Sequence, residues 1–533
     1  MKNLIITFIV VITIAPLSAS IACQPWQAHT NTDLTNLKIN AITITPQNIF
    51  NHDNPAENHG IHRLANVIHI KTRIDTIKWQ LLFKKGDQLD LRLLKETERN
   101  IRANRYINNV IIKPVRICGD QVDILVTTTD NWTLTPGVSY KKSGGENTSG
   151  IQITEINLFG KGKSLTFSYD KGIDRNESLF RYTDPQFNGT HRVLSLEARN
   201  KSDGDQFDIS FSLPFYQLNS KKSWGIEAQI QKQITPLYSN GNITSQISED
   251  TDFINLFYGW SKGLAGNHVT RMRTGWYHKK TSYQGVNGSI PSINFHKLSY
   301  PWIEYEYFRE QYDQRKNFRT MGRIEDISLG RHVKARLGLI TEALGSSDEY
   351  VYLATSYSEG FRPSENQLGL LTFDADTYTG NGILNGSTIK INGEWFWFQN
   401  SDSNYYLSGK YNLIDNPLPG QQILLGGDTG LRGYPIRYQA GDKSLVITAE
   451  KQYFFKWYPY KLVQFGAVIF ADAGAAWGQG NSKKVIADAG IGLRLVSTRS
   501  TGNSVMHIDL AFPINAPSTI DSYQLRITAE QFL

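Results

Sequence analysis

The sequence predicts a mainly β protein, in which a small α+β domain precedes a large transmembrane antiparallel β-barrel. Three observations predict it. An apolar export signal opens the chain, a short region of mixed helical and strand periodicity follows, and alternating segments then run for about four hundred residues to the end. The 533 residues suffice for both parts, and 26 Tyr, 25 Phe and 11 Trp suit a barrel with aromatic girdles.

Composition argues against two other classes. Charged residues make up 20% of the chain and hydrophobic residues 40%, with a mean hydropathy of −0.37, which does not fit a bundle of membrane helices. The formal net charge of +7 is spread along the chain without a basic helix. We therefore expect no nucleic-acid partner.

The N-terminus has the three parts of a secretory signal. Lys2 supplies a positive start, Leu4 to Pro16 is almost wholly apolar, and Ser20-Ile-Ala22 fits the small-x-small cleavage pattern. No other window approaches the roughly 18 apolar residues of a membrane-spanning helix. Residues 1–22 are therefore predicted to be a signal peptide, and the chain is predicted to be exported.

The chain has two cysteines, Cys23 and Cys118. The oxidising compartment of an exported protein favours a disulfide between them. The alternative is lipid modification of Cys23, although Ser20 stands where a lipoprotein signal usually has Leu. With a single pair, spacing does not decide between the two.

Residues 23–130 have the periodicities of a small α+β domain. Ile74 and Ile77 recur at helical spacing, Gly86 is a suitable helix terminator, and Asp90 is a suitable cap for the next helix. The expected elements are a strand over 37–44, helices over 74–82 and 91–104, and strands over 110–115 and 122–126.

The stretch 47–63 interrupts this domain with polar residues. It gathers the histidines and carboxylates His52, Asp53, Glu57, His59 and His62. A metal site is one interpretation, but no standard ligand spacing is present. A solvated loop is the favoured interpretation.

The motifs of this domain resemble those of a known module. Lys85-Gly-Asp87, the helix from Leu91 to Asn104, and Arg105-Tyr-Ile-Asn-Asn-Val110 with its hairpin resemble a POTRA domain. Such modules precede the barrels of the BamA/TamA and two-partner-secretion transporters. The resemblance implies one periplasmic module whose open strand edge receives unfolded polypeptide, since such an edge presents unpaired N–H and C=O groups. The stretch 47–63 departs from the basic module, and a plain spacer is the alternative.

After Asp130 the pattern changes to short alternating segments separated by Gly, Asn, Asp and Ser. Clear cases are Ser164–Tyr169, Phe207–Leu213, His507–Phe512 and Tyr523–Ala529. One face of each is apolar, as expected between lipid and a wet lumen. A soluble sandwich alternates likewise, but the export signal and the length favour one barrel over 131–533. The family resemblance implies sixteen strands, at about 25 residues for each strand with its loop.

Two stretches in the last third point to a charge pair inside the barrel. Gly426-Gly-Asp-Thr-Gly-Leu-Arg-Gly-Tyr434 has four glycines, which let the backbone turn tightly while Arg432 projects. Phe470-Ala-Asp-Ala-Gly474 lies in an alternating segment that places Asp472 on the lumen face. An arginine in a confined lumen requires a carboxylate. Asp472 is its expected partner, and Glu450, one strand earlier, is a second acceptor.

Both stretches resemble motifs of the same barrel family. Leu431-Arg432-Gly433-Tyr434 resembles the tip of its sixth extracellular loop, and Phe470-x-Asp472-x-Gly474 resembles its F-x-D-x-G strand. The resemblance implies that Arg432 bonds Asp472 and locks the loop within the barrel. An ordinary turn with a surface arginine is the alternative, since short motifs also match by accident.

The predicted function is an outer-membrane barrel that assists insertion or translocation of other polypeptides, with its N-terminal domain in the periplasm. Its expected partners are unfolded outer-membrane or secreted polypeptides and outer-membrane lipid, and no cofactor is implied. The alternative is a passive channel or structural barrel. An enzyme is not expected: Gly259-Trp-Ser-Lys-Gly263 matches a nucleophile pattern, but no helical pattern follows, which favours a barrel turn.

Overall fold

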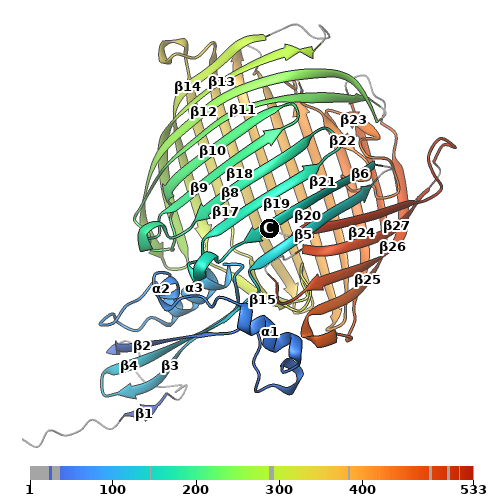
Figure 1. Ribbon diagram of the computed structural model, residues 1–533. Coiled ribbons are helices and arrows are strands. Elements are labelled where there is room, and N and C mark those ends of the chain that lie inside the picture. The colour runs from blue at the N-terminus through green and yellow to red at the C-terminus, as the bar shows by residue number, and fades with distance from the viewer. Residues whose placement is uncertain are drawn as a thin grey trace, which may run out of the picture.

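The chain forms a barrel with a small domain beneath one end, as Figure 1 shows. We call this end of the barrel the near end and the opposite one the far end. The predicted signal peptide, residues 1–22, lies outside the described residues. The computed structural model describes residues 23–26, 36–143, 146–239, 241–286, 293–381, 384–418, 420–478, 483–500, 504–514 and 516–531.

The small domain is built on a four-stranded sheet in the order β1-β3-β4-β2. Strands β2 and β4 run parallel, and the other neighbours run antiparallel. In the described part of the chain no helix is long and apolar enough to cross a membrane. The elements are β1 (Gln24–Pro25), β2 (Lys38–Gln47), α1 (Gly60–Ile68), α2 (Ile74–Lys78), α3 (Leu91–Arg102), β3 (Ile107–Cys118) and β4 (Gln121–Asp130).

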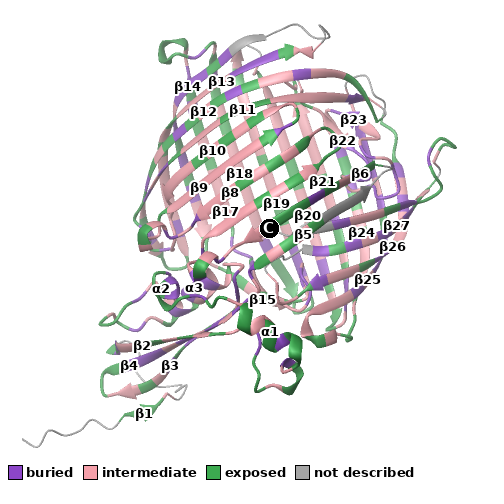
Figure 2. Cartoon of the chain, in the orientation of Figure 1, coloured by how far each residue is buried: buried purple, intermediate pink, exposed green. Residues whose placement is uncertain are grey.

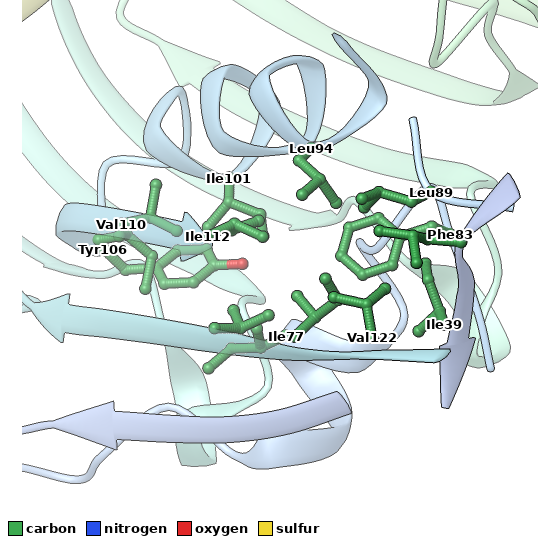
Figure 3. Close-up of a cluster of buried hydrophobic side chains, with 14 residues drawn as sticks. Ile39, Ile77, Phe83, Leu89, Leu94, Ile101, Tyr106, Val110, Ile112 and Val122 are labelled. Atoms are coloured by element: carbon green, nitrogen blue, oxygen red, sulfur yellow. The ribbon is translucent and has the colours of Figure 1, made fainter. Parts of the chain in front are cut away.

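The core of this domain lies between α3 and the sheet (Figure 3). Asp90 caps α3, because its carboxylate accepts hydrogen bonds from the backbone N–H groups of Arg92 and Leu93. Leu94 and Ile101, seven residues apart and therefore on one face of the helix, are almost fully buried in this core. The cap and the apolar face together fix where α3 begins and which side meets the sheet.

The stretch 47–63, predicted as a loop, contains part of a helix. A 3-10 turn spans Pro55–Glu57, and α1 begins at Gly60. The loop prediction was wrong because the residues at helical spacing, Ile61, Leu64 and Ile68, begin among polar residues and continue past residue 63.

The barrel predicted from the alternating segments is confirmed. In the described residues its wall consists of twenty antiparallel strands, and the last of them, β28, closes it by pairing with the first, β5. The strands are β5 (Leu134–Ser143), β6 (Glu146–Glu155), β7 (Ser164–Lys171), β8 (Asn176–Asp184), β9 (Val193–Lys201), β10 (Gly204–Leu213), β11 (Lys222–Ser239), β12 (Asn242–Ala265), β13 (His268–Gly285), β14 (Ile293–Arg309), β17 (His332–Ile340), β18 (Glu349–Ser364), β19 (Gln367–Asn381), β20 (Gly386–Asn400), β21 (Ser403–Asp415), β24 (Lys443–Phe454), β25 (Val463–Trp477), β26 (Ile486–Ser497), β27 (Ser504–Ile514) and β28 (Gln524–Gln531).

The predicted number of sixteen strands was wrong. Period-two alternation shows which face a residue takes, but it does not count strands. Neighbouring strands are closely joined: β9 ends at Lys201 and β10 begins at Gly204, while β12 ends at Ala265 and β13 begins at His268. The same length of chain therefore holds more strands than the family resemblance implied.

Two short hairpins accompany the wall. Strands β15 (Tyr312–Lys316) and β16 (Ile324–Ser328) pair between β14 and β17, and β22 (Ile423–Leu425) pairs with β23 (Gln439–Gly441) between β21 and β24. Exposed and less exposed residues alternate along the wall (Figure 2). On β25, Ile469 is 56% exposed while its neighbour Phe470 is 3% exposed. Large apolar side chains thus cover the outside of the barrel.

Candidate functional site

A long connection enters the barrel from the far end. It spans residues 416–442, between β21 and β24, and we call it the lumen loop. Its tip is held in a tight turn, because the backbone N–H of Leu431 donates to the carbonyl oxygen of Gly426 at 3.1 Å. This turn carries the predicted arginine.

Arg432 lies in an ion pair with two strands of the wall. Its Nε and Nη2 donate to the two carboxylate oxygens of Asp472 at 2.7 and 3.0 Å, a bidentate geometry. Its Nη1 donates to Glu450 at 2.9 Å. The guanidinium carbon lies 3.5 Å from the ring centroid of Phe470. The structure thus brings together the arginine, both acceptors and the aromatic residue that the sequence singled out.

The residues beside Arg432 anchor the same turn by packing. Leu431 and Tyr434 are at most 1% exposed, in a cluster with apolar residues of β24, β25 and β26. The Tyr434 hydroxyl lies 3.3 Å from the carbonyl oxygen of Ala487 and 3.2 Å from that of Ile514, so it donates to the wall. The arginine is therefore positioned from both sides.

Two glycines of the motifs leave the space that this contact needs. A Cβ on Gly433 would lie 2.7 Å from the Cβ of Asp488, and one on Gly474 would lie 2.6 Å from the carbonyl oxygen of Leu445. Both distances are shorter than any real Cβ contact. Any larger residue at either position would push the loop or the neighbouring strand away.

The ion cluster extends beyond the motifs. Asp509 is fully buried, and its carboxylate lies 2.5 Å from Arg494 and 3.5 Å from Arg526. It also lies 3.8 Å from Arg432. No sequence motif marked Asp509, Arg494 or Arg526. The polar face of the alternating C-terminal segments was the available signal, since Asp509 and Arg526 both lie on it.

A second segment enters the barrel from the near end. It spans residues 310–331, contains β15 and β16, and is called here the near-end hairpin. The ring of Phe318 packs against that of Phe396 with centroids 4.5 Å apart, and Arg319 pairs with Glu394 at 2.5 Å. Both partners lie on β20. No motif in the sequence indicated this segment.

The two inserted segments face each other across a cavity of about 320 Å³. The hairpin contributes Phe318 and Met321 to its lining, the lumen loop contributes Gly430 and Arg432, and the wall contributes Arg494 among others. The chain's own segments therefore occupy the lumen from both ends.

Helix α3 of the small domain holds the base of the near-end hairpin. Arg102 pairs with Asp326 at 2.5 Å, and Arg99 pairs with Glu310. Arg323 of the hairpin donates back to the carbonyl oxygen of Arg102 at 3.1 Å. The hairpin is thus attached both to the wall and to the small domain.

The small domain also contacts the near-end turns of the wall. The Thr76 hydroxyl donates to the carbonyl oxygen of Gly160, between β6 and β7, at 2.9 Å. The backbone N–H of Leu218, between β10 and β11, donates to Glu96 at 2.7 Å. The domain therefore lies across the near mouth with several turns fastened to it.

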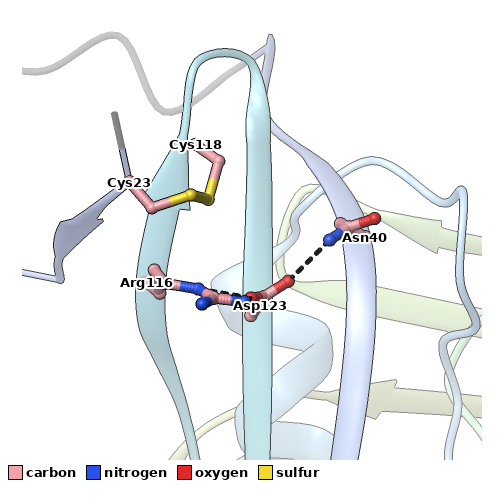
Figure 4. Close-up of a disulfide and its surroundings, with 5 residues drawn as sticks. All are labelled: Cys23, Asn40, Arg116, Cys118 and Asp123. Atoms are coloured by element: carbon pink, nitrogen blue, oxygen red, sulfur yellow. Dashed lines mark hydrogen bonds and ion pairs between the residues drawn. A yellow bond between two sulfur atoms is a disulfide. The ribbon is translucent and has the colours of Figure 1, made fainter. Parts of the chain in front are cut away.

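Cys23 and Cys118 form a disulfide that fixes β1 on the outer edge of β3 (Figure 4). Strand β1 pairs with Arg116 and Ile117, and the backbone N–H of Trp26 donates to the carbonyl oxygen of Val115 at 2.9 Å. Among the described residues no strand pairs with this edge between Ile107 and Pro114. Most of the edge is therefore without a strand partner there.

One further prediction, the turn at residues 259–263, differs from the structure. The stretch Gly259–Gly263, predicted as a turn, lies within β12, where the Ser261 hydroxyl donates to the carbonyl oxygen of Thr270 at 2.7 Å. The turn prediction was wrong because a β-bulge at this point accommodates the glycines inside a strand. In the part of the chain that the structure describes, no group of three or more His, Cys, Asp or Glu could hold a metal ion.

Comparison with known proteins finds likeness in structure alone. No family model matches the sequence, and no curated protein matches it. CdiB from Escherichia coli is 13% identical with a TM-score of 0.49, over 96% of this chain and 80% of that one. CdiB from Acinetobacter baumannii is 13% identical with a TM-score of 0.45, over 93% and 74%. BamA from Haemophilus ducreyi lacking POTRA domains 1–3 is 13% identical with a TM-score of 0.40, over 92% and 84%.

Proposed function

We propose that this protein is an outer-membrane β-barrel that assists insertion or translocation of other polypeptides, with its N-terminal domain in the periplasm. The observation that carries the proposal is the combination at the near mouth. A domain with an open strand edge lies across a barrel whose lumen is occupied by a segment attached to that same domain. In this arrangement, the domain that receives a polypeptide is attached to the segment that occupies the barrel entrance.

The outer surface of the wall supports a position in a membrane. Exposed apolar side chains recur on the outward face, as in strands that meet lipid. Towards the near end many of them are aromatic, as at the interface of a bilayer. We call this group the near-end aromatic girdle: Tyr258, Trp260, Tyr305, Phe361, Trp397, Tyr405, Tyr453 and Trp457.

Client polypeptide is received, in this proposal, by strand addition to β3. An edge strand offers unpaired backbone groups that pair with almost any extended sequence. Strand β1 supports this choice of edge, because a segment far away in the sequence already pairs there in extended form. The part between Ile107 and Pro114 is the proposed docking length, where an incoming strand displaces Glu98 from the backbone N–H of Ile112 and Arg102 from the carbonyl oxygen of Val110.

The two lumen segments have different roles in the proposed mechanism. The near-end hairpin leaves the lumen when a client is handled, whereas Arg432 keeps the lumen loop fixed to β24 and β25 throughout. No nucleotide, metal or redox cofactor is required. The driving force is the client's own folding and the burial of its apolar strands in lipid.

A passive channel or structural barrel is the second candidate. The occupied lumen disfavours a permanently open channel, since both inserted segments line the same cavity of about 320 Å³. Constitutive conductance without any effect on other proteins would favour this candidate instead.

The test is a quantitative proteome of the outer membrane and the secreted fraction, comparing a deletion strain with one that re-expresses the intact protein. Loss of one or a few proteins, restored on re-expression, indicates a dedicated translocator and names its client. A fall in many barrels indicates a general assembly factor. No change in either fraction would contradict the proposal and leave the channel as the better account.

Strand addition is tested separately with a photo-crosslinking amino acid in place of Asn109, on the open edge of β3. The matched control places it at Thr43, on the edge strand β2 at the other side of the sheet. We expect client adducts from position 109 and none from 43. Equal labelling at both positions would contradict the choice of edge.

A further inference from the structure

Helix α1 exposes its apolar face. Leu64, Val67 and Ile68 are 60%, 80% and 58% exposed, and Ile61 is 53% exposed. Residues 61, 64 and 68 are three and four positions apart and share one face of the helix. In Figure 2 the helix is largely exposed. A monomeric soluble protein rarely leaves such a helix face to water.

The face that α1 does bury is polar. His62 is fully buried, and its Nε2 lies 2.8 Å from the carbonyl oxygen of Tyr460 in the turn between β24 and β25. Asn66 donates to the carbonyl oxygen of Phe50 at 2.8 Å and accepts from the backbone N–H of Phe50 at 3.2 Å. Hydrogen bonds thus hold the helix in place while its apolar side points elsewhere.

The segment that contains α1 is attached to the wall on both sides of the place where β28 pairs with β5. Its first end meets Tyr460, and Glu57 pairs with Arg499, between β26 and β27, at 2.7 Å. Beyond its second end, Arg73 donates to the carbonyl oxygen of Phe159, between β6 and β7, at 2.9 Å. Strands β28 and β5 lie between these points in the barrel order. Figure 1 shows α1 below this part of the wall.

The closure above α1 is the weakest pairing of the wall. The register of β28 with β5 records a single residue pair, Ile527 with Lys142, in the described residues. The preceding pair, β27 with β28, is matched from Ser504 to Ala511. Helix α1 therefore lies beneath the point where, among the described residues, the fewest residue pairs join neighbouring strands of the wall.

The turn that anchors α1 to the wall exposes aromatic side chains beside the helix. The turn between β24 and β25 exposes Phe455, Trp457 and Tyr460 by 41%, 64% and 60%, and Trp457 belongs to the near-end aromatic girdle. The ring of His59, which precedes α1, lies edge-on to that of Tyr460 at 5.6 Å. The N-terminal end of α1 thus lies beside side chains placed at the bilayer interface.

We infer that α1 is an interfacial helix, which lays Ile61, Leu64, Val67 and Ile68 into the bilayer leaflet at the near end, beneath the closure of β28 on β5. This inference rests on the proposed membrane barrel. An amphipathic helix in the plane of the interface buries its apolar face about 5–10 Å deep. The occupant is lipid, because the turn that anchors the helix exposes aromatic side chains on the lipid-facing side of the wall.

The test uses the full-length protein in vesicles of phosphatidylethanolamine and phosphatidylglycerol. Its two native cysteines form a disulfide, so one added cysteine is the only free thiol for a spin label. Labels replace Leu64 and Ile68 on the apolar face, Arg63 on the polar side of the same helix, and Ile469 on the outside of the wall. Collision of each label with oxygen and with a water-soluble nickel chelate reports its depth.

We expect the labels of L64C and I68C to favour oxygen, shifting towards the value of I469C, while the label of R63C favours the nickel chelate. Labels at 64 and 68 as accessible to nickel as the label at 63, with 469 in lipid, would overturn this inference alone. A label at 469 in water would overturn the membrane barrel itself. Protection of position 64 only on addition of a client polypeptide would also overturn it, in favour of a client surface.

Discussion

The lumen loop and the near-end hairpin both enter the barrel, but they are held by different physics. The loop is fixed by a buried bidentate ion pair, since the side chains of Arg432 and Asp472 are 7% and 0% exposed. The hairpin is held by the packing of Phe318 and by the more exposed pair of Arg319 with Glu394, at 32% and 12%. A buried pair specifies one arrangement, whereas packing with a partly exposed pair allows another.

The lumen loop and the near-end hairpin also differ in which parts of the protein they are attached to. The lumen loop is fastened to the wall alone at its tip, and the hairpin is fastened both to the wall and to α3 of the small domain. Any movement of the small domain therefore reaches the hairpin directly and the loop only through the wall. This difference assigns the fixed role to the loop and the movable role to the hairpin in the proposed mechanism.

The largest expected effect is that of Arg432→Ala. Removing one partner of a buried ion pair costs about 3–5 kcal/mol, because the remaining carboxylates lose their counter-charge. We expect a barrel that still folds, judged by heat-modifiable migration in gels, but a fall of tenfold or more in its effect on client proteins. The matched control is Arg437→Ala in the same loop, whose pair with Asp174 is partly exposed. Unchanged activity in Arg432→Ala would contradict the locked loop.

Shortening the near-end hairpin is expected to have the next largest effect. Replacing residues 313–326 by a short Gly-Ser turn removes Phe318 and Met321 from the cavity lining. We expect a higher single-channel conductance in planar bilayers than that of the intact protein. Arg437→Ala serves as the control that leaves the hairpin whole. An unchanged conductance would show that the hairpin does not restrict the lumen.

A charge reversal at the link between the two parts has a smaller expected effect. Arg102→Glu sets two acidic residues against each other at a pair whose side chains are 11% and 14% exposed. We expect more rapid hydrogen exchange in the hairpin, and its return towards the original rate in the double variant with Asp326→Arg. A double variant that exchanges as fast as Arg102→Glu alone would argue against direct pairing.

The smallest expected effect concerns pH at the near mouth. Burial acts to raise the pKa of Glu57, but the backbone N–H of Asn51 and the cations Arg499 and Lys461 outweigh it and lower the pKa below its ordinary value of 4.5. A lowered pKa in the folded state contributes stability above pH 4.5, which is lost as the pH falls through the folded value.

The protection of residues 50–69 from hydrogen exchange, corrected for the intrinsic pH dependence of exchange, is therefore expected to be constant above pH 4.5 and to fall below it. Glu57→Gln should remove the step while leaving the lumen loop unaffected. A step of the same size in this variant would assign the pH dependence to another group.

The sequence predicted much of the wall and of the motif site, and the reason is local periodicity. Alternation along Val463–Trp477 assigns Asp472 to the lumen without any knowledge of the neighbours. Arg432 stood out as the one cation in a glycine-rich stretch. Asp509 and Arg494 did not stand out, because nothing in an alternating strand shows which residue lies opposite.

The positions of the near-end hairpin and of α1 could not be predicted from local sequence patterns. Phe318 contacts Phe396, and His62 contacts Tyr460, across long separations in sequence. Such contacts depend on how the wall closes, and no motif records them. Helix α1 also buries histidine and exposes leucine, which reverses the usual relation between hydrophobicity and burial.

The most direct test of the fixed loop and the movable hairpin is to bridge each of them to the wall. Arg319→Cys with Glu394→Cys would tie the hairpin, and Arg437→Cys with Asp174→Cys would tie the lumen loop, each joined by a bifunctional thiol reagent. The readout is delivery of the client that the proteome comparison identifies. Delivery should stop when the hairpin is tied and continue when the loop is tied. Continued delivery with a tied hairpin, or loss with a tied loop alone, would contradict the assignment of the two roles.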